Sequence, residues 1–211
     1  MRFADLDAVT VDGFGTLVEL EDPVPRLVAE LENRGIDRSP EEVAEAFAEE
    51  ASYYRRNAER GRDEESLFQL RANCMAVFLH ALALPMDRAD EFIEPFMASL
   101  VFRPAGGTVE ALGVLRAHSL KLAVVSNWDC SLSERLEELE LLEMFDAIVS
   151  SAEASAAKPA PRPFWLALER LGVAPERALH IGDEPADEQG AAAAGMRFAH
   201  APLSAAVAAL A

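Results

Sequence analysis

The sequence predicts an α/β protein, in which a parallel β-sheet is flanked by helices and carries an all-helical insert. Two observations predict the sheet: four short apolar runs each end at small or polar residues, and segments with helical periodicity separate them. A third observation predicts the insert, because residues 23–100 contain long amphipathic stretches and no strand-like run. The crossovers between parallel strands are expected to be right-handed.

The first apolar run, residues 8–12, reads Ala-Val-Thr-Val-Asp and is followed by Gly13 and Gly15. This pattern is typical of a buried strand that delivers an aspartate to a tight turn. Three later runs, at residues 121–126, 147–150 and 178–181, are predicted to be strands of the same kind. Helices are predicted at residues 108–118, 131–139, 162–171 and 187–194.

The helical insert is predicted at residues 21–102, which leaves residues 1–20 and 103–211 for the sheet domain. One of its helices is expected to start after Ser39, because serine caps helices, a proline is tolerated in the first turn, and two glutamates there face the positive helix end. Residues 102–107 are interpreted as the linker that returns to the sheet.

The composition indicates a globular protein that avoids anionic partners. Hydrophobic residues make up 51% and charged residues 27% of the chain. The formal net charge of −18 repels nucleic acids and anionic lipids, so an anionic substrate needs a local positive cluster or a bound cation. We therefore expect a small-molecule partner, with no nucleic acid and no membrane, since no run approaches the roughly 18 apolar residues of a membrane span.

A cytoplasmic location is expected from the cysteines and the N-terminus. Cys74 and Cys130 lie far apart in the sequence without further metal-ligating residues nearby, which is typical of reduced thiols. Aspartates interrupt the N-terminal apolar stretch and no small-residue cleavage site follows, so this stretch is not interpreted as a signal peptide.

Polar side chains follow the predicted strands at the points where they end. In chain order these residues are Asp12, Ser126, Asn127, Lys158, Asp183, Glu184 and Asp187. Because ligands of open α/β sheets bind beyond the carboxyl ends of the strands, these side chains are expected to converge there.

Four segments resemble, in order, the motifs of the haloacid dehalogenase-like hydrolase superfamily. They are residues 11–17 (VDGFGTL), 125–129 (VSNWD), 157–159 (AKP) and 180–187 (HIGDEPAD). One such motif alone is weak, whereas four in order are specific. The insert also occupies the position of that superfamily's helical (C1) cap. The resemblance thus covers nearly the whole chain and implies a Rossmann-like core domain with an inserted cap domain.

The resemblance implies an Mg²⁺-dependent phosphohydrolase that acts on a small phosphorylated metabolite through an aspartyl-phosphate intermediate. Asp12 would be the nucleophile, because a carboxylate can attack phosphorus once negative charge on both partners is neutralised. By similarity, the magnesium ligands would be the carboxylates of Asp12 and Asp183 and the backbone carbonyl of Phe14. Asp187 would bind the ion through water or brace the site.

The other motif residues would hold the phosphoryl group. Ser126 would donate a hydroxyl hydrogen bond, and Lys158 would hold the aspartate and the phosphoryl group together. Gly13 would allow a sharp turn that exposes backbone N–H groups, and Gly13, Phe14 and Asn127 are expected to contact substrate. Lys158 is notable because only two of the nineteen basic residues are lysine.

Simpler interpretations compete for several of these residues. Ser126 could cap a helix, Lys158 could be a surface lysine before a proline, and Asp187 could be the N-cap of the helix it opens. Glu184 fits a solvated loop carboxylate better than a metal ligand. His180 lies inside a strand run and is interpreted as a core histidine with satisfied hydrogen bonds.

The insert would set specificity, because a cap can close over a site and exclude water. Tyr53, Tyr54, Arg55 and Arg56 cluster on one of its predicted helices. An arginine there could meet a substrate carboxylate or phosphate. Packed tyrosines and solvated arginines are the preferred interpretation of this cluster.

Phe14 departs from the superfamily pattern, in which phosphatases carry a second aspartate two positions after the nucleophile. A phenyl ring cannot transfer a proton, and general acid–base help is worth about 10²–10⁴ in rate. Three explanations compete. The protein is a phosphohydrolase with another acid or an activated leaving group, a metal-independent 2-haloacid dehalogenase with Asp12 as nucleophile, or a weakly catalytic or non-catalytic phosphoryl-ligand binding protein.

Electrostatics favours the phosphohydrolase. Asp12, Asp183 and Asp187 crowded together without a cation would repel one another and raise at least one carboxyl pKa, which would spoil the nucleophile. Magnesium removes this conflict, whereas the dehalogenases use no metal. Phosphonoacetaldehyde hydrolase, another relative, needs a cap lysine, and residues 23–100 contain none.

Overall fold

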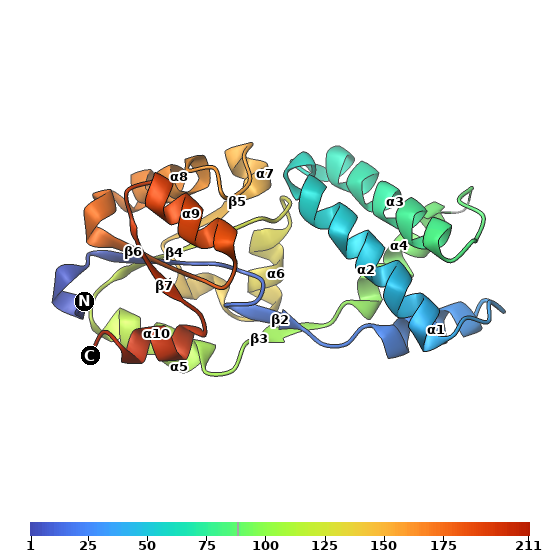
Figure 1. The fold of residues 1–211 in the computed structure, drawn as a ribbon, viewed down its shortest axis with the longest axis horizontal. Coiled ribbons are helices and arrows are strands. Elements are labelled where there is room, and N and C mark those ends of the chain that lie inside the picture. Colours follow the sequence, from blue (N-terminus) through green and yellow to red (C-terminus); the bar gives the residue numbers. More distant parts are fainter. Residues whose placement is uncertain (88) are drawn as a thin grey trace. The chain divides into compact units, whose positions relative to one another are not determined.

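The computed structural model of the protein describes residues 1–87 and 89–211. The chain folds as two compact units, one made of Met1–Glu19 and Arg103–Ala211 and the other of Leu20–Phe102. Figure 1 labels most of the helices and strands of both units. Within the described ranges, no helix is long and apolar enough to cross a membrane.

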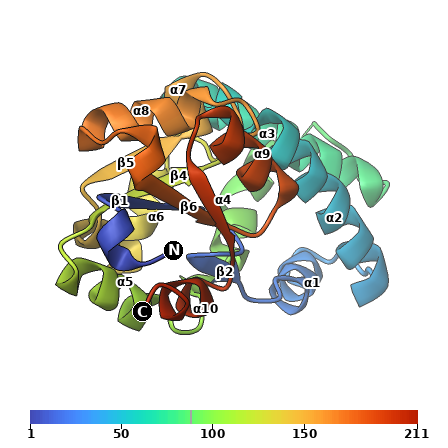
Figure 2. The ribbon, with the colours of Figure 1, turned by 60° about the vertical axis from the view of Figure 1, so that its left-hand side comes forward.

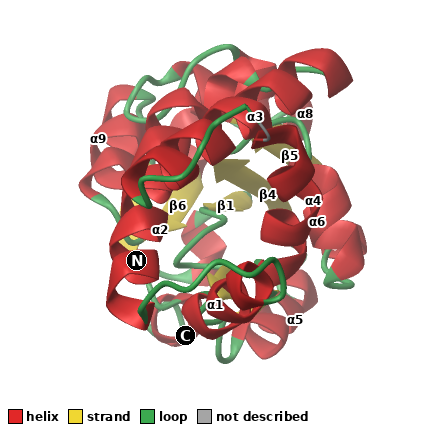
Figure 3. Cartoon of the chain, turned by 90° about the vertical axis from the view of Figure 1, so that its right-hand side faces the viewer, coloured by secondary structure: helices red, strands yellow, loops and turns green. Residues whose placement is uncertain are grey.

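The first unit contains a five-stranded parallel sheet with the strand order β5-β4-β1-β6-β7, part of which Figure 3 shows in yellow. The strands are β1 (Ala8–Val11), β4 (Lys121–Ser126), β5 (Ala147–Ser150), β6 (Ala178–Gly182) and β7 (Arg197–His200). β1 lies at the centre, where Val11 is opposite Val124 of β4 and Ile181 of β6. The predicted α/β class is confirmed.

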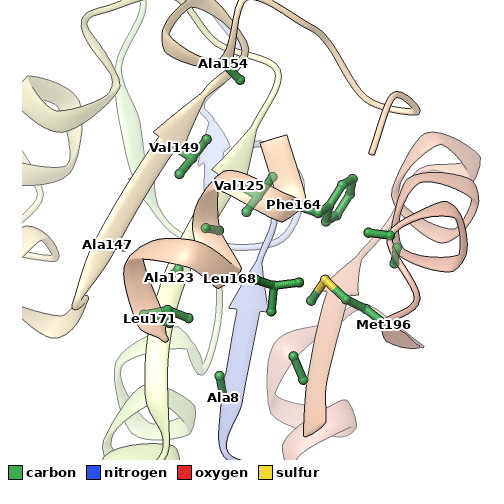
Figure 4. Packing of buried hydrophobic residues seen from close by; sticks show 14 residues of the cluster. Ala8, Ala123, Val125, Ala147, Val149, Ala154, Phe164, Leu168, Leu171 and Met196 are labelled. Atoms are coloured by element: carbon green, nitrogen blue, oxygen red, sulfur yellow. The ribbon is translucent and has the colours of Figure 1, made fainter. Parts of the chain in front are cut away.

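Helices cover both faces of this sheet, which explains why its inner strands are short apolar runs. On one face, Phe164 and Leu168 of α8 (Arg162–Leu171) form an apolar cluster with Val125 and Val149 (Figure 4). The same cluster includes Ala191 of α9 (Pro185–Ala193). On the other face, α5 (Thr108–Ala117) and α10 (Leu203–Ala208) lie side by side (Figure 2). The unit also contains α6 (Leu132–Glu138), α7 (Ser151–Ala154) and 3₁₀ turns at Phe3–Asp5, Leu142–Met144 and Pro175–Arg177.

Several elements of this unit were missed by the sequence analysis. β7 is an edge strand whose terminal residues are exposed, so it lacks the apolar run that marks the inner strands. α10 lies in the alanine-rich tail, where the apolar pattern is weak. The linker prediction for residues 102–107 was wrong at its start, because β3 (Phe102–Pro104) pairs with β2 (Val18–Leu20) in a two-stranded sheet.

The second unit consists mainly of helices with their own apolar core. Its helices are α1 (Val24–Glu32), α2 (Pro40–Asn57), α3 (Glu64–Ala81) and α4 (Ala89–Ser99), with a 3₁₀ turn at Ala58–Arg60. The predicted start of a helix after Ser39 is confirmed: Ser39 Oγ accepts a hydrogen bond from Glu42 N at 3.2 Å, and Glu42 Oε2 accepts one from Ser39 N at 2.8 Å. Phe78 and Phe96 pack edge to face in the core, with ring centroids 5.1 Å apart.

Candidate active site

The carboxyl ends of β1, β4 and β6 meet at one edge of the sheet, because these three strands are parallel neighbours. Asp12 directly follows β1, Ser126 is the last residue of β4, and Asp183 directly follows β6. Residues that are far apart in the sequence therefore converge at this edge, as is usual for ligand sites of open α/β sheets.

Asp12 is buried, with 5% of its surface exposed, and it accepts a hydrogen bond from Lys158 Nζ at Oδ1. Its backbone N–H donates to Ile181 O at 2.9 Å, which continues the ladder between β1 and β6 past the end of the strand. Burial raises the pKa of Asp12 and the charge of Lys158 opposes this rise. The carboxylate is thus held in place by a cation and by the sheet.

Lys158 is only 7% exposed, so the interpretation as a surface lysine was wrong. Its ammonium group donates to Asp12 Oδ1, to Asp187 Oδ1 at 2.5 Å and to Val125 O at 3.1 Å. These three acceptors use all three N–H groups of a lysine. Burial by itself lowers the pKa of Lys158, but the two carboxylates outweigh it and raise the pKa above its usual value. Lys158 therefore stays charged between the two carboxylates.

Asn127 holds the backbone of Lys158 with both ends of its amide. Its Oδ1 accepts a hydrogen bond from Lys158 N at 2.7 Å, and its Nδ2 donates to Lys158 O at 3.1 Å. The amide thereby fixes the residue that carries the cation of the site. The predicted substrate contact of Asn127 stays a prediction.

Asp187 is completely buried and is the most heavily hydrogen-bonded carboxylate of the site. Oδ1 accepts from Lys158 Nζ and from His180 Nε2 at 3.1 Å, and Oδ2 accepts from Glu184 N at 3.0 Å. Burial alone would raise the pKa of Asp187, but the hydrogen bond from His180 and the charge of Lys158 lower it below its usual range. Asp187 is not the N-cap of α9, because that helix begins at Pro185 and Asp187 occupies its third position.

Asp183 is exposed, unlike the other two aspartates, and Thr16 Oγ1 donates to its Oδ1 at 3.0 Å. Three aspartates, Asp12, Asp183 and Asp187, each offer one carboxylate oxygen, and these three oxygens lie within 4.8 Å of one another. Such a set of carboxylate oxygens fits a hard divalent cation. The glutamate beside it, Glu184, is exposed at the N-cap of α9 and contributes its backbone N–H to Asp187.

Gly13 and Gly15, in the loop that follows β1, are required by close contacts. A Cβ atom on Gly13 would lie 2.6 Å from Ser126 Oγ, and a Cβ atom on Gly15 would lie 2.5 Å from Asp183 Oδ2. Gly15 also has a φ of +88°, a backbone conformation that favours glycine. Only glycine at positions 13 and 15 therefore leaves room for the side chains of Ser126 and Asp183.

Gly15→Ala is expected to destabilise the protein by about 1–3 kcal/mol, because the methyl group meets the Asp183 carboxylate and the backbone is strained at positive φ. Urea unfolding measures this loss. Gly113→Ala in α5 is the matched control, because its Cβ would meet open space and alanine favours a helix. Equal stability of both variants would contradict the prediction.

Ser126 and Phe14 complete the set of predicted site residues. Ser126 is buried at the end of β4 and does not cap α6, whose N-cap is Ser131. Phe14 is 46% exposed and forms an isolated β-bridge with Val18. The roles predicted for the Ser126 hydroxyl and the Phe14 carbonyl stay predictions.

Two residues in contact with the acidic group, Thr16 and His180, were given no role in the sequence analysis. The core interpretation of His180 is correct, since it is fully buried and both ring nitrogens have partners, but one of these partners is Asp187. For His180, the sequence signal that could have indicated this contact was a polar residue inside a predicted buried strand. In the other unit, Tyr53 and Tyr54 pack against the helical core while Arg55 and Arg56 are exposed, in line with the preferred interpretation of that cluster.

Curated proteins of known sequence match part of this chain. Haloacid dehalogenase-like hydrolase domain-containing protein 3 of Mus musculus is 40% identical over 109 residues, which are 51% of this chain and 43% of that protein. Phosphoglycolate phosphatase of Escherichia coli (strain K12) is 36% identical over 87 residues, 41% of this chain and 34% of that protein. The matched segments thus span less than half the length of these relatives.

Solved structures match nearly the whole chain. L-2-haloacid dehalogenase from Xanthobacter autotrophicus has a TM-score of 0.66 at 26% identity, covering 92% of this chain and 77% of that one. A HAD phosphatase from Thermococcus onnurineus has a TM-score of 0.61 at 25% identity, covering 92% and 85%. A family model described as haloacid dehalogenase-like hydrolase matches residues 87–201, more than half of the chain. This match and the shared fold show that the chain belongs to the haloacid dehalogenase-like hydrolase family.

Proposed function

We propose that this protein is a magnesium-dependent phosphohydrolase that acts on a small phosphorylated metabolite through an aspartyl-phosphate on Asp12. The observation that carries the proposal is the close grouping of Asp12, Asp183 and Asp187. Lys158 balances one of their three negative charges, and burial lowers the pKa of His180 so that it adds none. The two remaining negative charges match one divalent cation.

The ligands proposed for magnesium are the carboxylates of Asp12 and Asp183 and the carbonyl of Phe14, with Asp187 acting through water or as a brace. These are oxygen donors, which Mg²⁺ prefers. When bound, the ion would neutralise negative charge on the phosphoryl group and on the nucleophile.

The residues of the chain account for both steps of the proposed hydrolysis. Lys158 holds Oδ1 of Asp12, so we assign Oδ2 as the oxygen that attacks phosphorus. The bond from phosphorus to the leaving oxygen breaks, and that oxygen takes the electron pair. Water then attacks the phosphorus of the aspartyl-phosphate and loses a proton to solvent. The bond between phosphorus and Asp12 Oδ2 breaks, which releases inorganic phosphate and the free carboxylate. Ser126 is proposed to hold a phosphoryl oxygen during both steps, while Lys158, whose three N–H groups are taken, is proposed to stabilise the phosphoryl charge as a nearby positive charge.

Phe14 supplies no proton to the leaving group, so the rate is expected to depend steeply on leaving-group acidity. Acetyl phosphate and aryl phosphates are expected to exceed sugar phosphates and nucleotides by about 10²–10⁴ in kcat/KM. Phosphate release from this panel, with and without Mg²⁺ and with Asp12→Asn as the blank, measures the effect. Phe14→Asp is expected to accelerate only the unactivated substrates. Equal rates across the panel would show that another group supplies the proton.

A metal-independent 2-haloacid dehalogenase is the second candidate function. It is favoured by the aromatic residue at position 14 and by the similarity to L-2-haloacid dehalogenase. Halide release from 2-chloropropionate without metal, together with no phosphate release from the panel, would establish it. Tight binding of phosphorylated compounds without any turnover would instead support a weakly catalytic or non-catalytic binding protein.

We also propose that the unit Leu20–Phe102 serves as the cap that decides substrate specificity, because it is inserted after the nucleophile loop as in the family's pattern. A cytoplasmic location is proposed from the spacing of the cysteines, because Cys74 and Cys130 lie far apart in the sequence without further metal-ligating residues nearby.

A further inference from the structure

His180 lies inside β6, fully buried, directly opposite Thr10 of β1. Thr10 Oγ1 and His180 Nδ1 are 2.8 Å apart, and His180 Nε2 and Asp187 Oδ1 are 3.1 Å apart. The ring also meets Phe164 edge to face, with ring centroids 4.9 Å apart. Neighbours on β1, α8 and α9 therefore fix the imidazole on three sides.

These contacts decide which ring nitrogen carries the proton. A neutral imidazole has a single N–H group, on one of its two ring nitrogens. The ionised carboxylate of Asp187 can only accept hydrogen bonds, so Nε2 must be the donor. Nδ1 is then an acceptor, and the hydroxyl of Thr10 donates to it. The hydrogen bonds consequently run in one direction, from Thr10 to His180 and from His180 to Asp187.

Asp187 in turn orients the cation of the site. Its Oδ1 accepts from both His180 and Lys158, so the orientation of this carboxylate sets where the ammonium group of Lys158 lies. Lys158 donates to Asp12 from the same ammonium group. Partners that orient the ligands of a metal site in this way usually account for about 10–100-fold in affinity or activity.

We propose that His180 is a positioning residue, which donates its Nε2–H to Asp187 and thereby fixes the carboxylate that holds Lys158 against Asp12. The inference rests on the proposed function, in which Asp12 is the nucleophile. A role limited to packing against Phe164 would be met by an apolar ring, without the cost of burying two polar nitrogens.

The hydrogen-bond direction is tested without any activity measurement. In the protein labelled with ¹⁵N-histidine, one of the four imidazoles of this chain is expected to show a hydrogen on Nε2 that exchanges slowly with water, because the ring of His180 is fully buried. If the signal disappears in His180→Gln, it belongs to His180. The control is His118→Gln, which removes a ring that stacks on Phe3 and is expected to leave the signal unchanged. A ring protonated at Nδ1 alone, with no hydrogen on Nε2, would overturn the proposal.

The functional consequence is tested by two matched variants. His180→Phe keeps the ring that meets Phe164 but loses the donor, whereas the amide of His180→Gln can still donate to Asp187. We expect kcat on acetyl phosphate to fall about 10–100-fold in His180→Phe with little change in KM, and to recover largely in His180→Gln. Equal kcat in the two variants, or an effect confined to KM, would reject the positioning role.

The two readouts separate this inference from the function on which it rests. An inactive wild-type protein with the Nε2–H tautomer would remove the proposed function and leave the hydrogen bond established. An active wild-type protein with the other tautomer would remove only this inference. If His180→Phe does not fold, the tautomer in the wild-type protein still decides the hydrogen bond, and the kcat of His180→Leu, which also lacks a donor, compared with that of His180→Gln decides its consequence.

Discussion

Lys158→Met is expected to destabilise the protein by about 3–5 kcal/mol and to abolish turnover. Methionine has a similar length but no charge, so Asp12 and Asp187 would face each other in a buried site without the cation that both now contact. Urea unfolding gives the loss of stability, and phosphate release from acetyl phosphate gives the loss of activity. Both effects come from the same unpaired carboxylates.

The loss of stability in Lys158→Met is expected to shrink as the pH falls. Without the lysine, burial and mutual repulsion would raise the folded-state pKa of at least one of the two carboxyl groups above its unfolded value. A group with a raised folded pKa costs stability as the pH rises through that pKa, so acid protonation relieves the cost.

Lys121→Met is the matched control for this prediction, because Lys121 is the other lysine of the chain. Its exposed side chain donates only to Leu171 O among the hydrogen bonds of the described residues. We expect a loss of stability below about 1 kcal/mol and unchanged turnover. Similar losses in the two lysine variants would show that the position of Lys158 has no special role.

Asp12→Asn is expected to lower kcat by about 10⁴-fold or more while the protein remains folded. An amide is a far weaker nucleophile than a carboxylate, and Lys158 keeps its contacts with Asp187 and Val125. Steady-state phosphate release with acetyl phosphate measures the effect, and circular dichroism verifies the fold. Asp12→Ala guards against slow deamidation of the Asn–Gly pair, which would regenerate the aspartate.

Asp7→Asn makes the same chemical change at the opposite end of β1. Asp7 is exposed and pairs with Arg177, with Oδ1 and Nη2 2.6 Å apart. Its replacement is expected to leave kcat unchanged, since exposed ion pairs contribute little. Turnover in Asp12→Ala within about tenfold of the wild-type rate would place the nucleophile elsewhere.

The sequence alone was sufficient to predict the class of fold. Inner strands of a parallel sheet are buried on both faces and therefore stand out as apolar runs, as at residues 121–126. It also placed Asp12, Ser126 and Asp183 at strand ends, because these residues directly terminate or follow the runs. β7 escaped detection, since an edge strand with exposed ends has no such run.

Only the tertiary structure decided which side chains touch one another in the site. Lys158 meets Asp12 across 146 positions of sequence, and Thr10 meets His180 across 170. These pairs depend on the strand order and on the register of β1 with β6, neither of which local periodicity determines. The buried pattern of β6 therefore marked His180 as a core residue, while its contact with Thr10 required β1 and β6, from opposite ends of the chain, to pair.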